Sequence, residues 1–71
     1  MKHPKAAPGK YLVIAVDIID GSQWAEGDFD NFDLAVGHAK NRTAGNQMLL
    51  MYIFDDTGKF LERFGSLESK R

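Results

Sequence analysis

Two stretches of the chain are apolar at almost every position, a pattern typical of strands that are covered on both faces. Residues 11–19 are interrupted only by Asp17, and residues 48–54 are apolar throughout. Successive side chains of a strand point to opposite faces, so each stretch presents an apolar row to both sides of a sheet. We therefore expect two long central strands whose second face is covered by another layer or lies in an interface.

Each long strand is expected to pair with a shorter one. Residues 21–23 are typical of a turn, and residues 24–29, which begin with Trp24, predict a short edge strand that pairs back onto the first long strand. Residues 59–66 alternate loosely between apolar and polar, which predicts an outer strand beside the second long strand.

The segment between these two strand pairs predicts a helix that starts at Asp30 and is stopped by Gly45 or Asn46. At 100° per residue, one stripe of the helix contains Phe32, Ala35, Val36, Ala39 and Thr43. Asp30 is the expected N-cap, because its carboxylate can accept hydrogen bonds from the free amides of the first turn. In that register, Phe29 and Leu34 are expected to form a hydrophobic staple.

This order of elements predicts an α+β fold, with an antiparallel sheet of three to four strands (β-β-α-β-β) and one helix packed on one face. We assign residues 11–66 to a single domain, residues 1–10 to a flexible N-terminal arm and residues 67–71 to a polar C-terminal tail. With 71 residues, the chain is close to the lower size limit for a domain that folds alone.

The composition indicates a soluble protein of a reducing compartment. There are no cysteines, so neither disulfides nor thiolate metal sites are expected. The apolar runs are too short to cross a membrane, and the N-terminus lacks the apolar core of a secretory signal. We therefore expect a cytoplasmic protein without a membrane partner. The net charge of −1 argues against a dedicated nucleic-acid binder, which usually carries a basic surplus.

The triplet Asp56-Thr57-Gly58 raises one sharp catalytic hypothesis, because aspartic proteases carry the same letters. In those enzymes two aspartates share a proton, and a second apolar segment far downstream supports the site. Here only twelve residues follow Lys59. Preceded by Asp55, the same letters suit a hairpin turn in which aspartate caps backbone amides and glycine takes the left-handed position. We therefore assign Asp55 and Gly58 structural roles.

No other grouping of residues predicts catalysis or a bound metal. Asp17, Asp20 and Glu26 could gather a weak divalent cation, but turns, capping and solubility explain acidic residues in this region better. His38 lies on a helix side near Arg42, without a second histidine or a cysteine at ligand spacing. We predict no catalytic, cofactor-binding or metal-binding residues, and hence no cofactor and no enzymatic activity.

The overall pattern resembles small bacterial domains of unknown function with a β-β-α-β-β arrangement. The resemblance rests on a first hairpin with a tryptophan, "FDNFDLAVGHAK" as the helix and "IFDDTGKFLERFGS" as the closing hairpin. It covers roughly residues 11–66 and implies the fold. It transfers no site, because such families have no assigned activity.

The leading functional prediction is a non-enzymatic homodimeric module that acts as an accessory or regulatory protein through protein contacts, with other proteins as alternative partners. One helix covers one face of the sheet, so the second apolar face needs a partner, and self-association is the commonest solution. The expected interface residues are Tyr11, Val13, Ala15, Leu49, Met51 and Ile53. The pattern alone does not fix which row of each strand faces the helix.

Two alternatives remain open at this stage. The first is nucleic-acid binding, in which aromatic side chains stack on bases and basic side chains contact phosphates. The aromatic candidates are Tyr11, Tyr52, Phe60 and Phe64, and the basic candidates are Lys2, Lys5, Lys10, Lys59 and Arg63. The second is small-molecule binding or catalysis at the cleft of a dimer.

Overall fold

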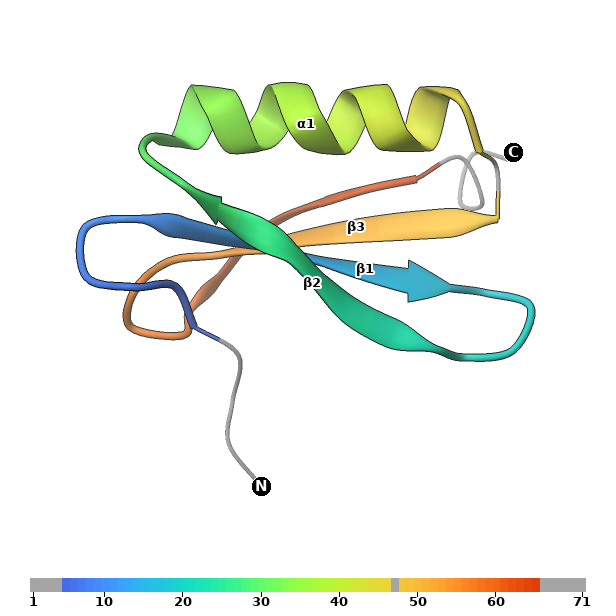
Figure 1. Ribbon diagram of the computed structural model, residues 1–71, viewed down its shortest axis with the longest axis horizontal. Helices are drawn as coiled ribbons and strands as arrows, with labels where there is room; N and C mark the ends of the chain where they lie inside the picture. Colours follow the sequence, from blue (N-terminus) through green and yellow to red (C-terminus); the bar gives the residue numbers. More distant parts are fainter. Residues whose placement is uncertain (1–4, 47, 66–71) are drawn as a thin grey trace.

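The computed structural model describes residues 5–46 and 48–65, which form four strands and one helix (Figure 1). In chain order these are β1 (Tyr11–Asp17), β2 (Gln23–Phe29), α1 (Phe32–Ala44), β3 (Leu49–Phe54) and β4 (Phe60–Phe64). The strands form one antiparallel sheet in the order β2-β1-β3-β4, and α1 packs against one of its faces. The predicted α+β class and element order are confirmed, with β1 and β3 at the centre. Trp24 lies in β2, which is an edge strand.

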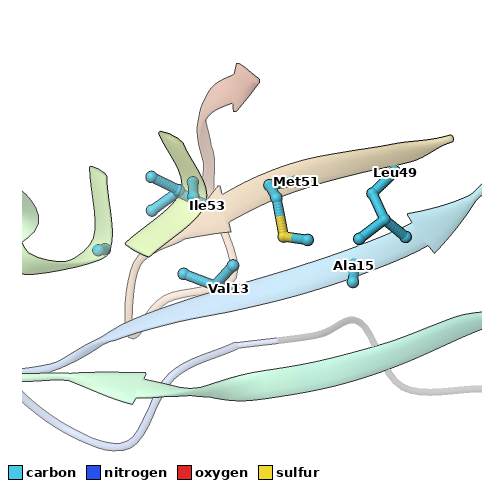
Figure 2. Close-up of a cluster of buried hydrophobic side chains, with 7 residues drawn as sticks. Val13, Ala15, Leu49, Met51 and Ile53 are labelled. Carbon is cyan, nitrogen blue, oxygen red and sulfur yellow. The ribbon is translucent and has the colours of Figure 1, made fainter. Parts of the chain in front are cut away.

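The core lies between α1 and the two central strands. Val13 pairs with Ile53 and Ala15 pairs with Met51 across β1 and β3, and all four side chains are fully buried. Figure 2 shows these residues together with Leu49, gathered on neighbouring strands. The helix contributes Ala35 and Ala39, which are also fully buried, so its predicted stripe faces the sheet. Small side chains at these positions let the helix backbone approach the sheet closely.

The helix begins one residue later than the sequence predicts. Asn31 is the N-cap, and its side-chain oxygen accepts a hydrogen bond from the Leu34 amide at 2.9 Å. Asp30 forms an ion pair with Lys10 instead, so its predicted capping role is wrong. The later start also removes the predicted staple, because the fourth helical position is now Ala35 and Leu34 is 52% exposed.

Replacing the true cap should therefore cost more stability than replacing its neighbour. We expect Asn31→Ala to lower the free energy of unfolding by about 1 kcal/mol, because an amide of the first turn loses its acceptor. Asp30→Ala should have the smaller effect, since it removes only an exposed ion pair. Urea denaturation of both variants measures the difference, and a larger loss for Asp30→Ala would contradict this assignment of the cap.

The turn between β3 and β4 has the predicted chemistry. Asp55 Oδ1 accepts hydrogen bonds from the Thr57 amide at 2.8 Å, the Thr57 hydroxyl at 2.7 Å and the Lys59 amide at 3.0 Å. The Thr57 hydroxyl and the two amides hold the pKa of Asp55 below its ordinary value. Gly58 has a φ of 87°, a left-handed conformation that side chains with a branched Cβ strongly disfavour. The structural roles predicted for Asp55 and Gly58 are confirmed.

The backbone of Gly58 gives a direct test of this turn. We expect Gly58→Val to lower the free energy of unfolding by more than about 1 kcal/mol, because valine must adopt a positive φ. Asp56→Asn is the matched control, since Asp56 Oδ2 accepts from the Gly9 amide at 2.8 Å and an asparagine oxygen can do the same. Equal denaturation midpoints for the two variants would show that the turn does not require the left-handed conformation.

Candidate interaction surface

The side of the sheet that faces away from α1 is the principal candidate site, and we call it the open face. Its central part consists of the alternate residues of β1 and β3, which pair as Leu12 with Phe54, Ile14 with Tyr52 and Val16 with Leu50. None of these six side chains is charged, and all except Leu12 remain partly exposed. Among the described residues, no helix or strand crosses this face (Figure 1).

Three aromatic rings from β3 and β4 gather on the open face. The ring centroid of Phe60 lies 5.9 Å from that of Tyr52 and 5.9 Å from that of Phe54. Aromatic pairs at such distances and inclined angles attract each other. Phe60 is nevertheless 48% exposed, so much of its ring faces solvent. Phe60 is the most exposed of the large apolar side chains described on the open face.

Two shallow hollows lie on this face. The larger, of about 660 Å³, is lined along β3 and β4 by Tyr52, Phe54, Phe60 and Leu61, together with the charged residues Glu62 and Arg63. The smaller, of about 280 Å³, lies over the middle of the sheet, and we call it the central hollow. Its lining residues are Ile14, Val16, Gln23, Tyr52 and Phe54. Both hollows are walled mainly by apolar side chains.

The six residues predicted to form an interface lie on the other side of the sheet. Val13, Ala15, Leu49, Met51 and Ile53 belong to the core beneath α1, and Tyr11 packs edge-on against Phe32 of the helix with ring centroids 5.9 Å apart. The interface prediction is therefore wrong for Val13, Ala15, Leu49, Met51 and Ile53, because their side chains are already buried within one chain, whereas Tyr11 is partly buried on the same side of the sheet. The opposite rows of the same strands form the open face.

The sequence holds one signal for which row of each central strand faces the helix, namely the size of the side chains. A helix whose buried stripe contains two alanines sits close to the sheet, which favours the row with a small residue, Ala15, beneath it. The opposite row carries the bulky rings of Tyr52 and Phe54, which suit a looser surface. Of the aromatic residues proposed for nucleic-acid stacking, Tyr52 and Phe60 reach the open face, whereas Phe64 packs against the core on the helix side.

A polar cluster ties α1 to the edge strand β2 on the helix side. The Glu26 side chain is only 9% exposed, and its carboxylate lies 2.7 Å from His38 Nε2 and 2.8 Å from Arg42 Nε. Trp24 Nε1 donates to the second carboxylate oxygen at 2.6 Å. Burial by itself raises the pKa of Glu26, but the hydrogen bonds from Arg42, His38 and Trp24 outweigh it and lower the pKa to about 2. Both carboxylate oxygens of Glu26 are engaged by these partners, so we assign the cluster a structural role.

The acidic residues that were considered as ligands of a divalent cation make separate hydrogen bonds. Asp17 accepts from the Ile19 amide and Asp20 from the Ser22 amide, both at 2.8 Å, whereas Glu26 belongs to the helix cluster. Within residues 5–46 and 48–65, no three His, Cys, Asp or Glu side chains are grouped so that they could hold a metal ion. Nothing in the described part of the chain therefore assembles a metal centre.

The predicted flexible arm is packed against the domain over its last residues. The Ala6 amide donates to the Asp55 carbonyl at 3.1 Å, and the Ala6 side chain is buried. The Ala7 amide approaches the Asp28 carboxylate at 3.4 Å. The arm prediction is thus wrong for residues 6–10, while residues 1–4, with Lys2, and the predicted tail 67–71 lie outside the described residues. Lys10, a phosphate-contact candidate, is paired with Asp30.

Fold and surface together define a small α+β domain with an uncovered apolar sheet face. Comparisons with protein-family models, with curated proteins and with solved structures find no match for this chain. In the part of the chain that the structure describes, no helix is long and apolar enough to cross a membrane.

Proposed function

We propose that this protein is a non-enzymatic module that forms a homodimer through its open face and acts as an accessory or regulatory protein through protein contacts. One observation carries the proposal: the six central residues of the open face are uncharged and largely apolar, and no described helix or strand covers them. The central part of a protein interface is typically depleted of charge and enriched in aromatic residues, as this face is.

The energetic argument for a partner is strong for so small a domain. At about 25 cal/mol per Å², roughly 500 Å² of apolar sheet left in water forgoes about 12 kcal/mol, which is comparable to the stability of a whole domain. Large apolar patches on small soluble proteins generally mark interaction sites. A partner on the open face would cover the side of the sheet that α1 leaves exposed.

A second copy of the chain is the partner that the surface favours. Two copies bring together identical faces whose six central residues are uncharged, with Arg63 of β4 beside Tyr52. The net charge of −1 also means that two copies repel each other only weakly. Two-fold homodimers are the commonest closed assemblies of soluble proteins, and sheets stack face to face about 10 Å apart with interlocking side chains.

The choice of face can be tested with two charge substitutions. We expect Tyr52→Glu to dissociate the dimer, because the two-fold symmetry introduces two like charges into an apolar contact. Lys40→Glu, on the exposed side of α1, is the control and should leave the association unchanged. Light scattering on both variants measures their masses, and a Tyr52→Glu variant that stays dimeric would show that the open face is not the interface.

Single-stranded nucleic acid is a second candidate occupant of the same face. The observation that favours it is the grouping of Tyr52, Phe54 and Phe60, since exposed aromatic rings on a sheet can stack on bases. Fluorescence anisotropy with labelled oligonucleotides at increasing salt tests this directly. Under the dimer proposal we expect no binding at physiological salt, whereas tight binding that weakens steeply with salt would favour the nucleic-acid function.

A further inference from the structure

The N-terminal segment, residues 6–10, lies on the side of the sheet that faces away from α1 (Figure 1). One of its contacts is with β2, where the Ala7 amide approaches the Asp28 carboxylate at 3.4 Å. Another is with the end of β3, where the Ala6 amide donates to the Asp55 carbonyl at 3.1 Å. Because β1 lies between β2 and β3, the segment crosses over β1.

This crossing covers the Leu12 end of the open face. Leu12 pairs with Asp28 in β2 and with Phe54 in β3, so it lies at the level where the segment passes. Leu12 is only 8% exposed, whereas Ile14 and Val16, which follow it in the same row of β1, are partly exposed. The part of the open face that is left for a partner is therefore the end that holds Ile14 and Val16.

This remaining part consists of two levels of side chains, which we name after their residues of β1. In the strand order β2-β1-β3-β4, the Ile14 level consists of Ala25, Ile14, Tyr52 and Arg63. The Val16 level consists of Gln23, Val16 and Leu50. Gly65, which follows β4, lies beside Leu50, since a Cβ added to Gly65 would come within 2.2 Å of the Leu50 side chain.

We propose that two copies meet through this end of the open face, about a two-fold axis that runs across the strands, midway between the Ile14 level and the Val16 level. The inference rests on the homodimer proposed above and names its orientation. Rotation about this axis keeps the strand order and exchanges the two levels, so Ile14 lies over Val16 of the other copy. In the same way, Tyr52 lies over Leu50. Each contact joins a larger and a smaller apolar side chain, which suits facing sheets whose side chains interdigitate.

The position of Arg63 favours this axis over its alternatives. With the proposed axis, Arg63 faces the Gly65 position of the other copy, where no side chain competes for the space. An axis along β3 would keep the levels and place Arg63 over Ile14, which would move a charge from water onto an apolar side chain. An axis across the strands at the Ile14 level itself would place the two copies of Arg63 opposite each other, and like charges repel.

The N-terminal segment favours the same axis. Neighbouring levels are about 6.8 Å apart, because each residue of a strand advances about 3.4 Å. The proposed axis places the segment of each copy one level beyond Val16 of the other copy, where β1 has already ended at Asp17. An axis along the strands between β1 and β3 would stack the two segments on each other and keep the sheets from approaching to about 10 Å.

Spin labels on introduced cysteines measure the orientation, since the chain has no cysteine of its own. Lys59 is exposed and lies at the covered end of the sheet, where its carbonyl accepts from the Asp55 amide. In Lys59→Cys, the proposed axis places the two labelled positions at opposite ends of the dimer, about 30 Å apart, whereas an axis along the strands leaves them less than about 20 Å apart. Ser22→Cys, at the other end of the sheet, is the matched control, because either axis keeps its two copies within about 20 Å.

Double electron–electron resonance measures both distances, and sedimentation equilibrium verifies that each labelled protein is dimeric. In wild-type dimers of labelled and unlabelled chains, we also expect intermolecular nuclear Overhauser effects between the methyl groups of Ile14 and Val16. Short distances at both labelled positions would overturn the proposed orientation but leave the homodimer standing. A long distance at position 22 in a dimer would show that the copies meet elsewhere, and a wild-type chain that stays monomeric would overturn both proposals.

Discussion

Met51→Glu is expected to yield no folded protein. Met51 is fully buried between the sheet and α1, where it pairs with Ala15 and belongs to the core cluster. A carboxylate at this position would lose its hydration without gaining a partner, and the thioether contacts of the core would be lost as well. A loss above about 4 kcal/mol is a large part of the total stability expected for such a small domain. Circular dichroism and thermal unfolding measure the outcome.

The neighbouring residue provides the matched control for this prediction. Tyr52→Glu places the same charge one position along β3, on the open face, where the carboxylate can reach water in a single chain. We expect this variant to be folded but less prone to dimerise. A folded Met51→Glu protein, or an unfolded Tyr52→Glu protein beside it, would contradict the assignment of the two rows of β3.

Glu26 is expected to make the stability of the protein fall steeply in acid. Its pKa is about 2 in the folded protein against 4.5 as its ordinary value. A carboxylate whose pKa is lowered by folding contributes its stabilisation above the unfolded pKa and loses it as the pH falls toward the folded pKa. We expect Glu26 to contribute about 2 to 3 kcal/mol at pH 7, allowing for the partial exposure of Arg42 and His38, and most of this to be lost between about pH 5 and about pH 2.

Comparison with Glu26→Gln isolates this contribution from those of other acidic residues. The glutamine variant keeps the shape of the side chain but has no carboxylate to titrate. Urea denaturation of both proteins at pH 7, 5 and 2 should show a wild-type advantage of about 2 to 3 kcal/mol at pH 7 that shrinks to below about 1 kcal/mol at pH 2. A pH-independent difference would show that Glu26 does not titrate as the cluster requires.

The fold could be predicted from the sequence because its signals are local. The two long apolar stretches became β1 and β3, and the chemistry of Asp55 and Gly58 fixed the turn between β3 and β4. Each of these features depends on residues within a few positions of one another. The helical stripe followed from the same short-range periodicity, so α1 and its buried alanines were also predicted.

The face of the sheet that receives the helix could not be predicted in this way. Both rows of β1 and β3 are apolar, so alternation does not distinguish core from surface, and only the difference in side-chain size between the rows bears on the choice. As a result, Met51 and Val13 were assigned to an interface although they lie in the core. The sequence predicted that one apolar face would remain uncovered, but it assigned the wrong rows to it.

The remaining errors involve contacts between residues that are distant in the chain. Asp30 and Asn31 are both good capping residues, and Asp30 is engaged by Lys10, twenty positions away. The packed end of the N-terminal segment depends on a hydrogen bond between Ala6 and Asp55. Neither contact has a periodic or compositional signature. The Glu26 cluster likewise joins a strand to the side of a helix and becomes visible only in three dimensions.

The central claim is that the uncovered sheet face is closed by a second copy of the chain, and the mass of the wild-type protein in solution tests it most directly. Sedimentation equilibrium at micromolar concentration should give twice the chain mass of 7.9 kDa, decreasing toward the mass of one chain on dilution. A mass of 7.9 kDa at every concentration would contradict the claim, because the open face would then be stable in water without a partner.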